Sequence, residues 1–244
     1  MEKLWKYVIC STAFVLAAMV LAAAYTSRSR SEGTISVTGL GETEFTSDMI
    51  VIEGSIKVKN DVAAEGYVEL EDQREKVVDF LVSKGVSGES ISFNMPTARE
   101  MFESVYVEGK YVGETSAGFV LTQSFTIESM DIDIVEVAAR QLPSLMADGI
   151  MLEVYEPMYY YTQLESVKHD LIGAAAADAH ARAELLATNG GARLGQLISS
   201  RAGVFQITAA TGDEEFSAGG SFNLSSREKK ARVTVRAEFK IRNN

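Results

Sequence analysis

The sequence predicts an α+β fold: antiparallel β-sheets with a long hairpin, packed by one long alanine-rich helix and two shorter helices. Three observations support this class. Residues 164–189 form a helical run rich in alanine, the residue with the highest helix propensity. The β-rich residues 90–130 are interrupted by Glu108-Gly109, a dipeptide typical of a hairpin turn. Strands and helices do not alternate strictly, which argues against a doubly wound parallel sheet.

The first predicted elements are two strands and a helix. Residues 34–42 alternate apolar and polar side chains, and residues 47–59 place their apolar side chains on one face, so both are predicted strands. Residues 62–84 carry apolar side chains at helical spacing, and Gly85 ends this predicted helix. Its expected core-facing stripe is Tyr67, Leu70, Val77, Val78 and Leu81.

The middle of the chain is predicted to hold the hairpin and a second helix. The hairpin strands are residues 97–107 and 111–127. Residues 131–148 are a predicted helix that ends or kinks near Pro143, because the proline ring clashes with the carbonyl four residues earlier. Residues 150–155 then return as a strand that leads toward the long helix.

The long helix combines many alanines with a few larger side chains. Small side chains allow a helix to lie close to a sheet, and Gly190 and Gly191 are expected to end the helix. The larger residues expected on one apolar stripe are Leu164, Val167, Leu171 and Leu185. The remaining elements are a strand at residues 193–209, a loop at 211–226 and a last strand at 229–242.

The N-terminal residues 1–26 are predicted to be a membrane anchor or a signal peptide. Residues 7–25 are an uncharged run of 19 residues, which is long enough to span a hydrocarbon core. The alternative is cleavage after Ala24, which ends a short alanine run like those before signal-peptide cleavage sites. The anchor is favoured because the apolar run is long for a signal peptide. Residues 27–33 are a polar linker, and residues 34–243 are predicted to form one domain outside the cytoplasm.

Composition and motifs exclude several function classes. The net charge of −11 argues against a nucleic-acid partner. Cys10 is the only cysteine, so no intramolecular disulfide can form. His169 and His180 lie about 16 Å apart along one helix and cannot share a metal ion. Motifs for zinc hydrolases, serine hydrolases and phosphate loops are missing from the sequence, and we predict no catalytic residue, metal or cofactor.

Four tyrosines are the candidate contact residues that the sequence suggests. Tyr155, Tyr159, Tyr160 and Tyr161 lie where a predicted strand gives way to the long helix. Tyrosine clusters suit subunit interfaces and ligand pockets, because each ring offers a large apolar area and a polar tip. The alternative, which is favoured, is simple packing at this junction.

Three segments carry a resemblance to a known family. The helix and the turn after it contain A-x-x-D-A-x-x-R-A-E followed by L-G-x-L, here Ala175, Asp178, Ala179, Arg182, Ala183, Glu184, Gly190, Gly191, Leu194, Gly195 and Leu197. The opening strand contains Ile35, Val37, Gly39, Gly41 and Glu42, and the closing strand contains Val233, Val235, Ala237, Phe239 and Ile241. In order and spacing, residues 33–243 resemble the SIMPL family of bacterial envelope proteins.

The resemblance implies a non-enzymatic envelope protein with a poorly defined, loosely stress-related role. It also implies a homo-oligomer, since some family members assemble into rings. The protein would be anchored in the inner membrane with its domain in the periplasm, or free in the periplasm if residues 1–24 are removed. We therefore expect a self-associating scaffold, and the alternative is a binding protein for a small or peptidic envelope ligand. The resemblance provides no functional residues or ligand identity.

Overall fold

The computed structural model describes residues 12–22, 33–211 and 217–243. Residues 12–22 form a helix whose side chains are exposed. Within the described residues, no helix is both long and apolar enough to cross a membrane. The predicted membrane segment, residues 7–25, lies partly outside the described residues, so its role stays a prediction.

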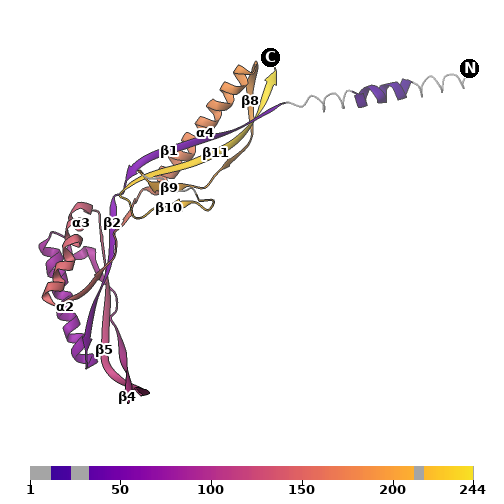
Figure 1. Cartoon of the computed structure of the whole chain (residues 1–244). Helices are drawn as coiled ribbons and strands as arrows, with labels where there is room; N and C mark the ends of the chain where they lie inside the picture. The colour runs from indigo at the N-terminus through magenta and orange to yellow at the C-terminus, as the bar shows by residue number, and fades with distance from the viewer. Residues whose placement is uncertain (1–11, 23–32, 212–216, 244) are drawn as a thin grey trace, which may run out of the picture. The chain divides into compact units, whose positions relative to one another are not determined.

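The structure confirms the α+β class and most predicted elements (Figure 1). The helices are α2 (Ala63–Ser83), α3 (Ile132–Gln141) and α4 (Leu164–Asn189), with short 3₁₀ segments at Gly88–Ser90 and Leu142–Asp148. The strands are β1 (Thr34–Thr46), β2 (Met49–Asn60), β3 (Ile91–Phe93), β4 (Thr97–Val107), β5 (Lys110–Ser129), β6 (Met151–Val154), β7 (Met158–Tyr160), β8 (Ala192–Ala202), β9 (Gln206–Ala209), β10 (Ser221–Phe222) and β11 (Glu228–Asn243).

The strands form two sheets. The five-stranded sheet has the order β1-β11-β9-β10, and β8 also pairs with β11. Strand β11 pairs antiparallel with both β8 and β9, whereas the two-residue strand β10 pairs parallel with β9. The six-stranded sheet has the order β3-β5-β2-β6, with β4 on β5 and β7 on β2, and its pairings are antiparallel.

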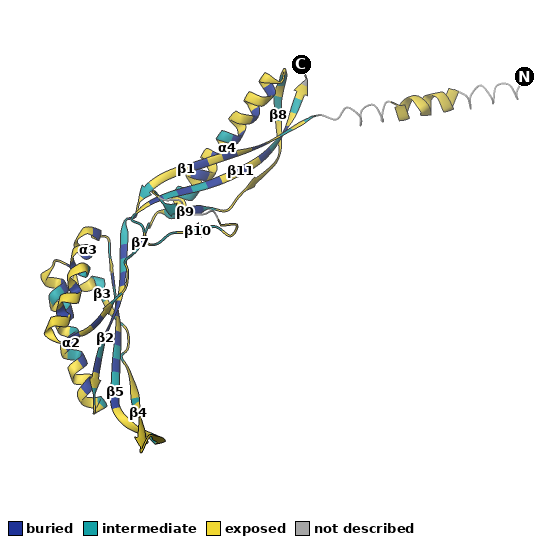
Figure 2. Cartoon of the chain, in the orientation of Figure 1, coloured by how far each residue is buried: buried dark blue, intermediate teal, exposed yellow. Residues whose placement is uncertain are grey.

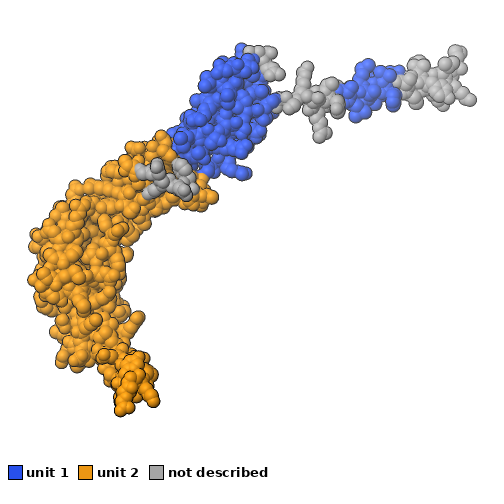
Figure 3. All heavy atoms as spheres, in the orientation of Figure 1, with its two compact units in different colours: residues 1–41, 172–203, 233–244 blue, residues 42–171, 204–232 orange. Residues whose placement is uncertain are grey.

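The chain divides into two compact units (Figure 3). Unit 1 comprises residues 1–41, 172–203 and 233–244, and unit 2 comprises residues 42–171 and 204–232. Their charges differ in sign. Unit 1 holds 10 Lys and Arg against 5 Asp and Glu, whereas unit 2 holds 13 against 29. The acidic character of the whole chain therefore comes from unit 2.

The core of unit 2 lies between the six-stranded sheet and the helices α2 and α3. The largest of its fully buried side chains is Phe125 of β5, which lies among aliphatic residues of β2 and α2. Helix α2 buries Gly66, Leu70, Gln73, Val77 and Leu81. The expected position of Tyr67 on this stripe is wrong, because the tyrosine is 47% exposed. The buried positions follow spacings of three and four, and Tyr67 lies about 100° away from Gly66 around the helix.

Two predicted features of unit 2 are confirmed: the hairpin turn and the end of a helix near Pro143. The hairpin turns at Glu108 and Gly109, which have φ angles of 49° and 77°. Two successive residues with positive φ form the two-residue turn that matches the twist of a hairpin. Helix α3 ends at Gln141, and Pro143 lies in the 3₁₀ segment that follows. Gly149, with a φ of 86°, closes this segment in the left-handed conformation.

Unit 1 packs the alanine face of α4 on its sheet. The buried residues of α4 are spaced by four: Leu171, Ala175, Ala179, Ala183 and Ala187. The expected apolar stripe is wrong at Leu185, which is 63% exposed. Leu185 lies two residues after Ala183, which turns it about 200° away from the buried face. Alanines fill the helix–sheet contact because the backbones lie too close for leucine.

The C-terminal strands differ from the prediction in two respects. The predicted strand 193–209 is two strands, β8 and β9, which are separated by residues 203–205. Gly203 donates a backbone hydrogen bond to the carbonyl of Thr234, and a Cβ on this glycine would lie 2.8 Å from the Thr234 hydroxyl oxygen. The chain therefore passes close to β11 at Gly203. The predicted loop also contains the short strand β10.

Candidate functional site

The four predicted tyrosines have separate surroundings. Tyr159 is buried, and its hydroxyl donates a 2.7 Å hydrogen bond to Oε1 of Glu136. Burial, and then the bond to this carboxylate, raise the pKa of Tyr159 to about 12. The ring of Tyr161 packs on Phe45 at a centroid distance of 4.8 Å. Tyr155 is half exposed, and the hydroxyl of Tyr160 contacts a thioether in its own strand. Their role in ligand or subunit contact stays a prediction.

A hollow of about 250 Å³ lies beside Tyr155 and Tyr159 in unit 2. The residues that line it are mostly apolar, and Glu136 and Arg140 are the charged ones. The other lining residues are Ile52, Ala139, Pro143, Val154 and Pro157. A mostly apolar concavity with few polar groups is typical of small-molecule sites.

The two histidines lie on α4, as expected, and both are exposed. The ring of His180 meets Phe239 edge-on at a centroid distance of 5.7 Å. Among the residues that the structure describes, no group of three or more His, Cys, Asp or Glu side chains could hold a metal ion.

Three of the residues that carry the family resemblance, Gly39, Asp178 and Arg182, lie where β1 contacts α4. A Cβ on Gly39 would lie 2.1 Å from the carbonyl oxygen of Ala175 and 2.4 Å from the amide nitrogen of Ala179. Only glycine leaves room for this contact between β1 and α4. Asp178 accepts hydrogen bonds of 2.8 Å from the backbone amide of Leu40 and from Nε of Arg182. The close approach at Gly39 and the hydrogen bond from Leu40 to Asp178 therefore hold the helix on the strand.

The turn end of the β4–β5 hairpin is an exposed apolar surface, which we call the ribbon (residues 102–114; Figure 2). Its exposed apolar residues are Phe102, Val105, Tyr106, Val107, Tyr111 and Val112. Tyr106 and Tyr111 are cross-strand partners whose ring centroids lie 5.9 Å apart. Val105 and Val107 flank Tyr106 and therefore point to the opposite face. Both faces of the ribbon are thus apolar.

The ribbon is not among the contact residues predicted from the sequence, although the sequence carries a sign of it. In the described residues, the part of β5 before Phe119 pairs only with β4, whereas residues 119–129 also pair with β2. Apolar residues beside the turn thus have no second layer to cover them. Consecutive apolar residues on both sides of Glu108-Gly109, rather than strict alternation, were the available sign.

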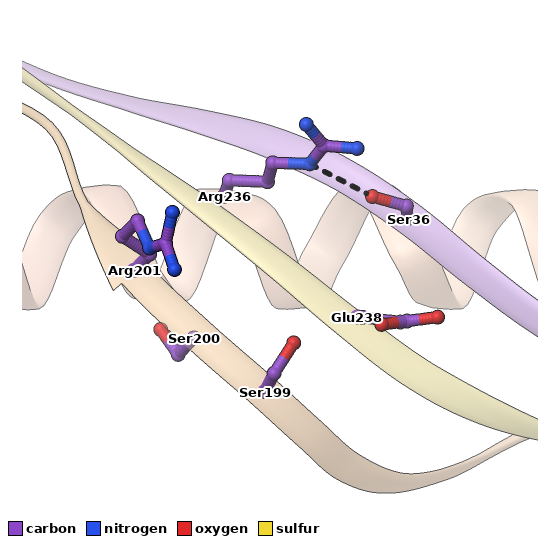
Figure 4. Close-up of a pocket in the computed structure, with 6 residues that line it drawn as sticks. All are labelled: Ser36, Ser199, Ser200, Arg201, Arg236 and Glu238. Atoms are coloured by element: carbon purple, nitrogen blue, oxygen red, sulfur yellow. Dashed lines mark hydrogen bonds between the residues drawn. The ribbon is translucent and has the colours of Figure 1, made fainter.

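A second hollow, of about 340 Å³, lies on the sheet of unit 1 (Figure 4). Its lining residues are Ser36, Ser199, Ser200, Arg201, Arg236 and Glu238. Arg236 donates a hydrogen bond of 3.3 Å from Nε to the Ser36 hydroxyl, and Arg201 is its cross-strand partner. This polar hollow was also missed, because it joins strands that are far apart in the sequence.

Comparison with protein families agrees with the resemblance seen in the sequence. Residues 35–239 match the SIMPL family, which is described as a protein of unknown function (DUF541). A comparison with curated proteins found no match. The matched region includes both the alanine face of α4 and the ribbon, and it covers most of the chain. The protein therefore belongs to the SIMPL family.

Proposed function

We propose that this protein is a non-enzymatic, self-associating component of the bacterial cell envelope. In this proposal, residues 7–25 hold it in the inner membrane, and the domain of residues 34–243 lies in the periplasm. The observation that carries self-association is the ribbon, with exposed apolar side chains on both faces. The N-terminal apolar run and the family resemblance support the location. A stress-related role rests on the family resemblance alone.

Burial of the ribbon would provide much of the association energy. Full burial of one large apolar side chain contributes about 1.5–3 kcal/mol. The six apolar residues of the ribbon would together offset a loss of translational and rotational freedom estimated at roughly 4–15 kcal/mol. Strand β4 offers a second means of association, because in this segment its described pairing is with β5 alone. Its other edge presents backbone groups that a strand of a second copy could bind.

The charges of the ribbon favour a protein partner over an anionic lipid surface. Glu103, Glu108 and Glu114 lie in the ribbon, and Lys110 is its one basic residue. A net negative segment is repelled by anionic headgroups. A second copy of the chain can bury the tyrosines and valines while the glutamates stay at the rim.

The test is the mass of the full-length chain in a mild detergent, measured by light scattering after size exclusion. We expect a defined oligomer whose mass falls in the double variant Tyr106→Ser and Tyr111→Ser. The matched control is Leu185→Ser with Leu186→Ser, which removes two exposed apolar side chains from α4. Because the control keeps residues 7–25 and the ribbon, it should remain oligomeric. A monomeric wild-type chain, or equal behaviour of both variants, would contradict the proposal.

A second candidate function is the binding of a small or peptidic ligand in the hollow beside Tyr155. Its apolar wall with Glu136 and Arg140 favours this alternative. Native mass spectrometry of the full-length protein from membranes would detect a retained ligand. The variant Tyr155→Ala should lose that ligand, whereas Tyr67→Ala, at an exposed tyrosine of α2, should keep it. Retention in both variants would argue against this hollow.

A further inference from the structure

We propose that the open face of the unit 1 sheet binds a phosphate group between Arg201 and Arg236. Helix α4 covers the other face of this sheet, where Val37, Ala237 and Phe239 are buried. Side chains alternate between the faces of a strand, so Ser36 and Arg236 point away from the helix. Figure 4 shows the two arginines and the three serines of the hollow on neighbouring strands.

The two arginines lie opposite each other, and no acidic side chain of the described residues forms an ion pair with either of them. Arg236 pairs with Arg201 in the register of β11 and β8. Like charges in directly opposed positions destabilise a sheet. Within the described part of the chain, neither guanidinium lies within 4.0 Å of a carboxylate, whereas Arg182 does bind Asp178. An anion bound between the arginines would attract both guanidinium groups and offset the repulsion between them.

The donors around the arginines suit an oxyanion. The 3.3 Å hydrogen bond from Nε of Arg236 to Ser36 orients this guanidinium and leaves its two terminal nitrogens available. Ser199 lies opposite Glu238 on the open face and lines the same hollow with a hydroxyl donor. Ser200 lies opposite the buried Ala237 and therefore points to the face that α4 covers. Planar guanidinium groups bind phosphate through paired hydrogen bonds, and hydroxyls can complete the shell. Glu238 is the one acidic group of the lining, and it would disfavour ligands that bring a second negative charge close to it.

The size and charge of the surroundings favour a small ligand over a polyanion. The hollow of about 340 Å³ lies at the lower end of the range for small-molecule sites. Unit 2 has more than twice as many acidic as basic residues, so a long nucleic acid would be repelled by the same chain. The phosphate could belong to free phosphate or to a phospholipid headgroup, and both offer the same oxygens to the arginines.

The test is isothermal titration calorimetry of the full-length chain in a non-ionic detergent. Two probes distinguish the sources: inorganic phosphate, and glycerophosphoglycerol, the soluble headgroup of an anionic phospholipid. We expect saturable binding of at least one probe, and the tighter one identifies the source. In the double variant Arg201→Ala and Arg236→Ala, the affinity should fall at least about tenfold, since each charged hydrogen bond is lost.

Matched variants distinguish specific binding between Arg201 and Arg236 from a non-specific attraction of anions to positive charge. Arg193→Ala with Arg242→Ala removes the same charge from another cross-strand arginine pair of β8 and β11. This control should bind the probe as the wild type does. Arg201→Lys with Arg236→Lys keeps the charge but loses the planar fork, and it should bind more weakly than the wild type. The proposal is overturned if the wild type binds neither probe, or if both alanine variants lose affinity equally.

Discussion

Helices α2 and α4 each pack on an antiparallel sheet, but they fill the contact in opposite ways. Helix α2 presents leucines and valines to the unit 2 sheet, where Phe125 fills the centre of the core. Helix α4 presents alanines, and Gly39 of β1 lets the two backbones approach each other. The comparison shows two ways to fill a helix–sheet contact: large side chains in unit 2, and a close approach of the backbones in unit 1. Substitutions that remove volume should damage unit 2, and substitutions that add volume should damage unit 1.

The largest expected effect is the loss of volume in unit 2. Phe125→Ala removes a side chain that is almost fully buried, and it should lower the free energy of unfolding by about 3–5 kcal/mol. Chemical denaturation followed by circular dichroism measures this change. The control Phe222→Ala removes the same side chain from a half-exposed position of β10, outside the ribbon, and it should cost much less stability. A similar loss in both variants would refute the volume argument.

The next effect is the addition of volume in unit 1. Ala179→Leu places a large side chain where Gly39 already contacts the α4 backbone, and it should cost about 1–3 kcal/mol. Ala177→Leu adds the same atoms on the exposed side of α4 and should be close to neutral. Hydrogen–deuterium exchange of peptides from β1 and α4 would locate the change. Equal protection in the two variants would show that backbone proximity does not limit this core.

A smaller effect concerns one hydrogen bond in unit 2. Tyr159→Phe removes the bond to Glu136 and should cost about 1–2 kcal/mol at neutral pH. The folded pKa of Tyr159 is raised from 10.0 to about 12, so its stabilisation is complete below pH 10 and is lost as the pH rises toward 12. The wild type should therefore lose its advantage over the variant in this window. Tyr160→Phe is the control and should show neither effect, because among the described residues the Tyr160 hydroxyl bonds to the Met158 thioether and to no carboxylate.

The smallest effect tests the polar link between α4 and β1. Hydrogen bonds from Arg182, and then from the Leu40 amide, lower the pKa of Asp178. A lowered folded pKa means that the stabilisation is present above pH 3.8 and is lost as the pH falls through the folded value. Asp178→Asn should lower the Tm slightly at pH 7, and its difference from the wild type should shrink in acid. A constant difference down to pH 2 would show that the charge of Asp178 does not contribute.

Helix α4 was predictable from the sequence, but the face that it buries was not. The helix, its glycine stop and the motif around Asp178 were predictable because they depend on local propensity and spacing. The buried face was predicted wrongly at Leu185, since hydrophobicity alone favours leucine over alanine in a core. Only the short distance from Ala175 to Gly39 reverses that preference, and this distance depends on a strand far away in the sequence.

The two candidate sites, the ribbon and the hollow of unit 1, likewise depend on contacts between residues that are far apart in the sequence. The exposure of the ribbon results from where β2 stops pairing with β5, and the hollow of unit 1 results from the register that places Arg201 opposite Arg236. The sequence alone determined the fold class, the hairpin turn and the end of helix α3 near Pro143, because short-range backbone preferences and side-chain spacing control these features. It also indicated the family, through the order and spacing of its motifs. The tertiary structure decided which faces are buried, how the chain divides into two units and which charges meet. Those features depend on contacts such as that between Leu40 and Asp178, which are 138 residues apart.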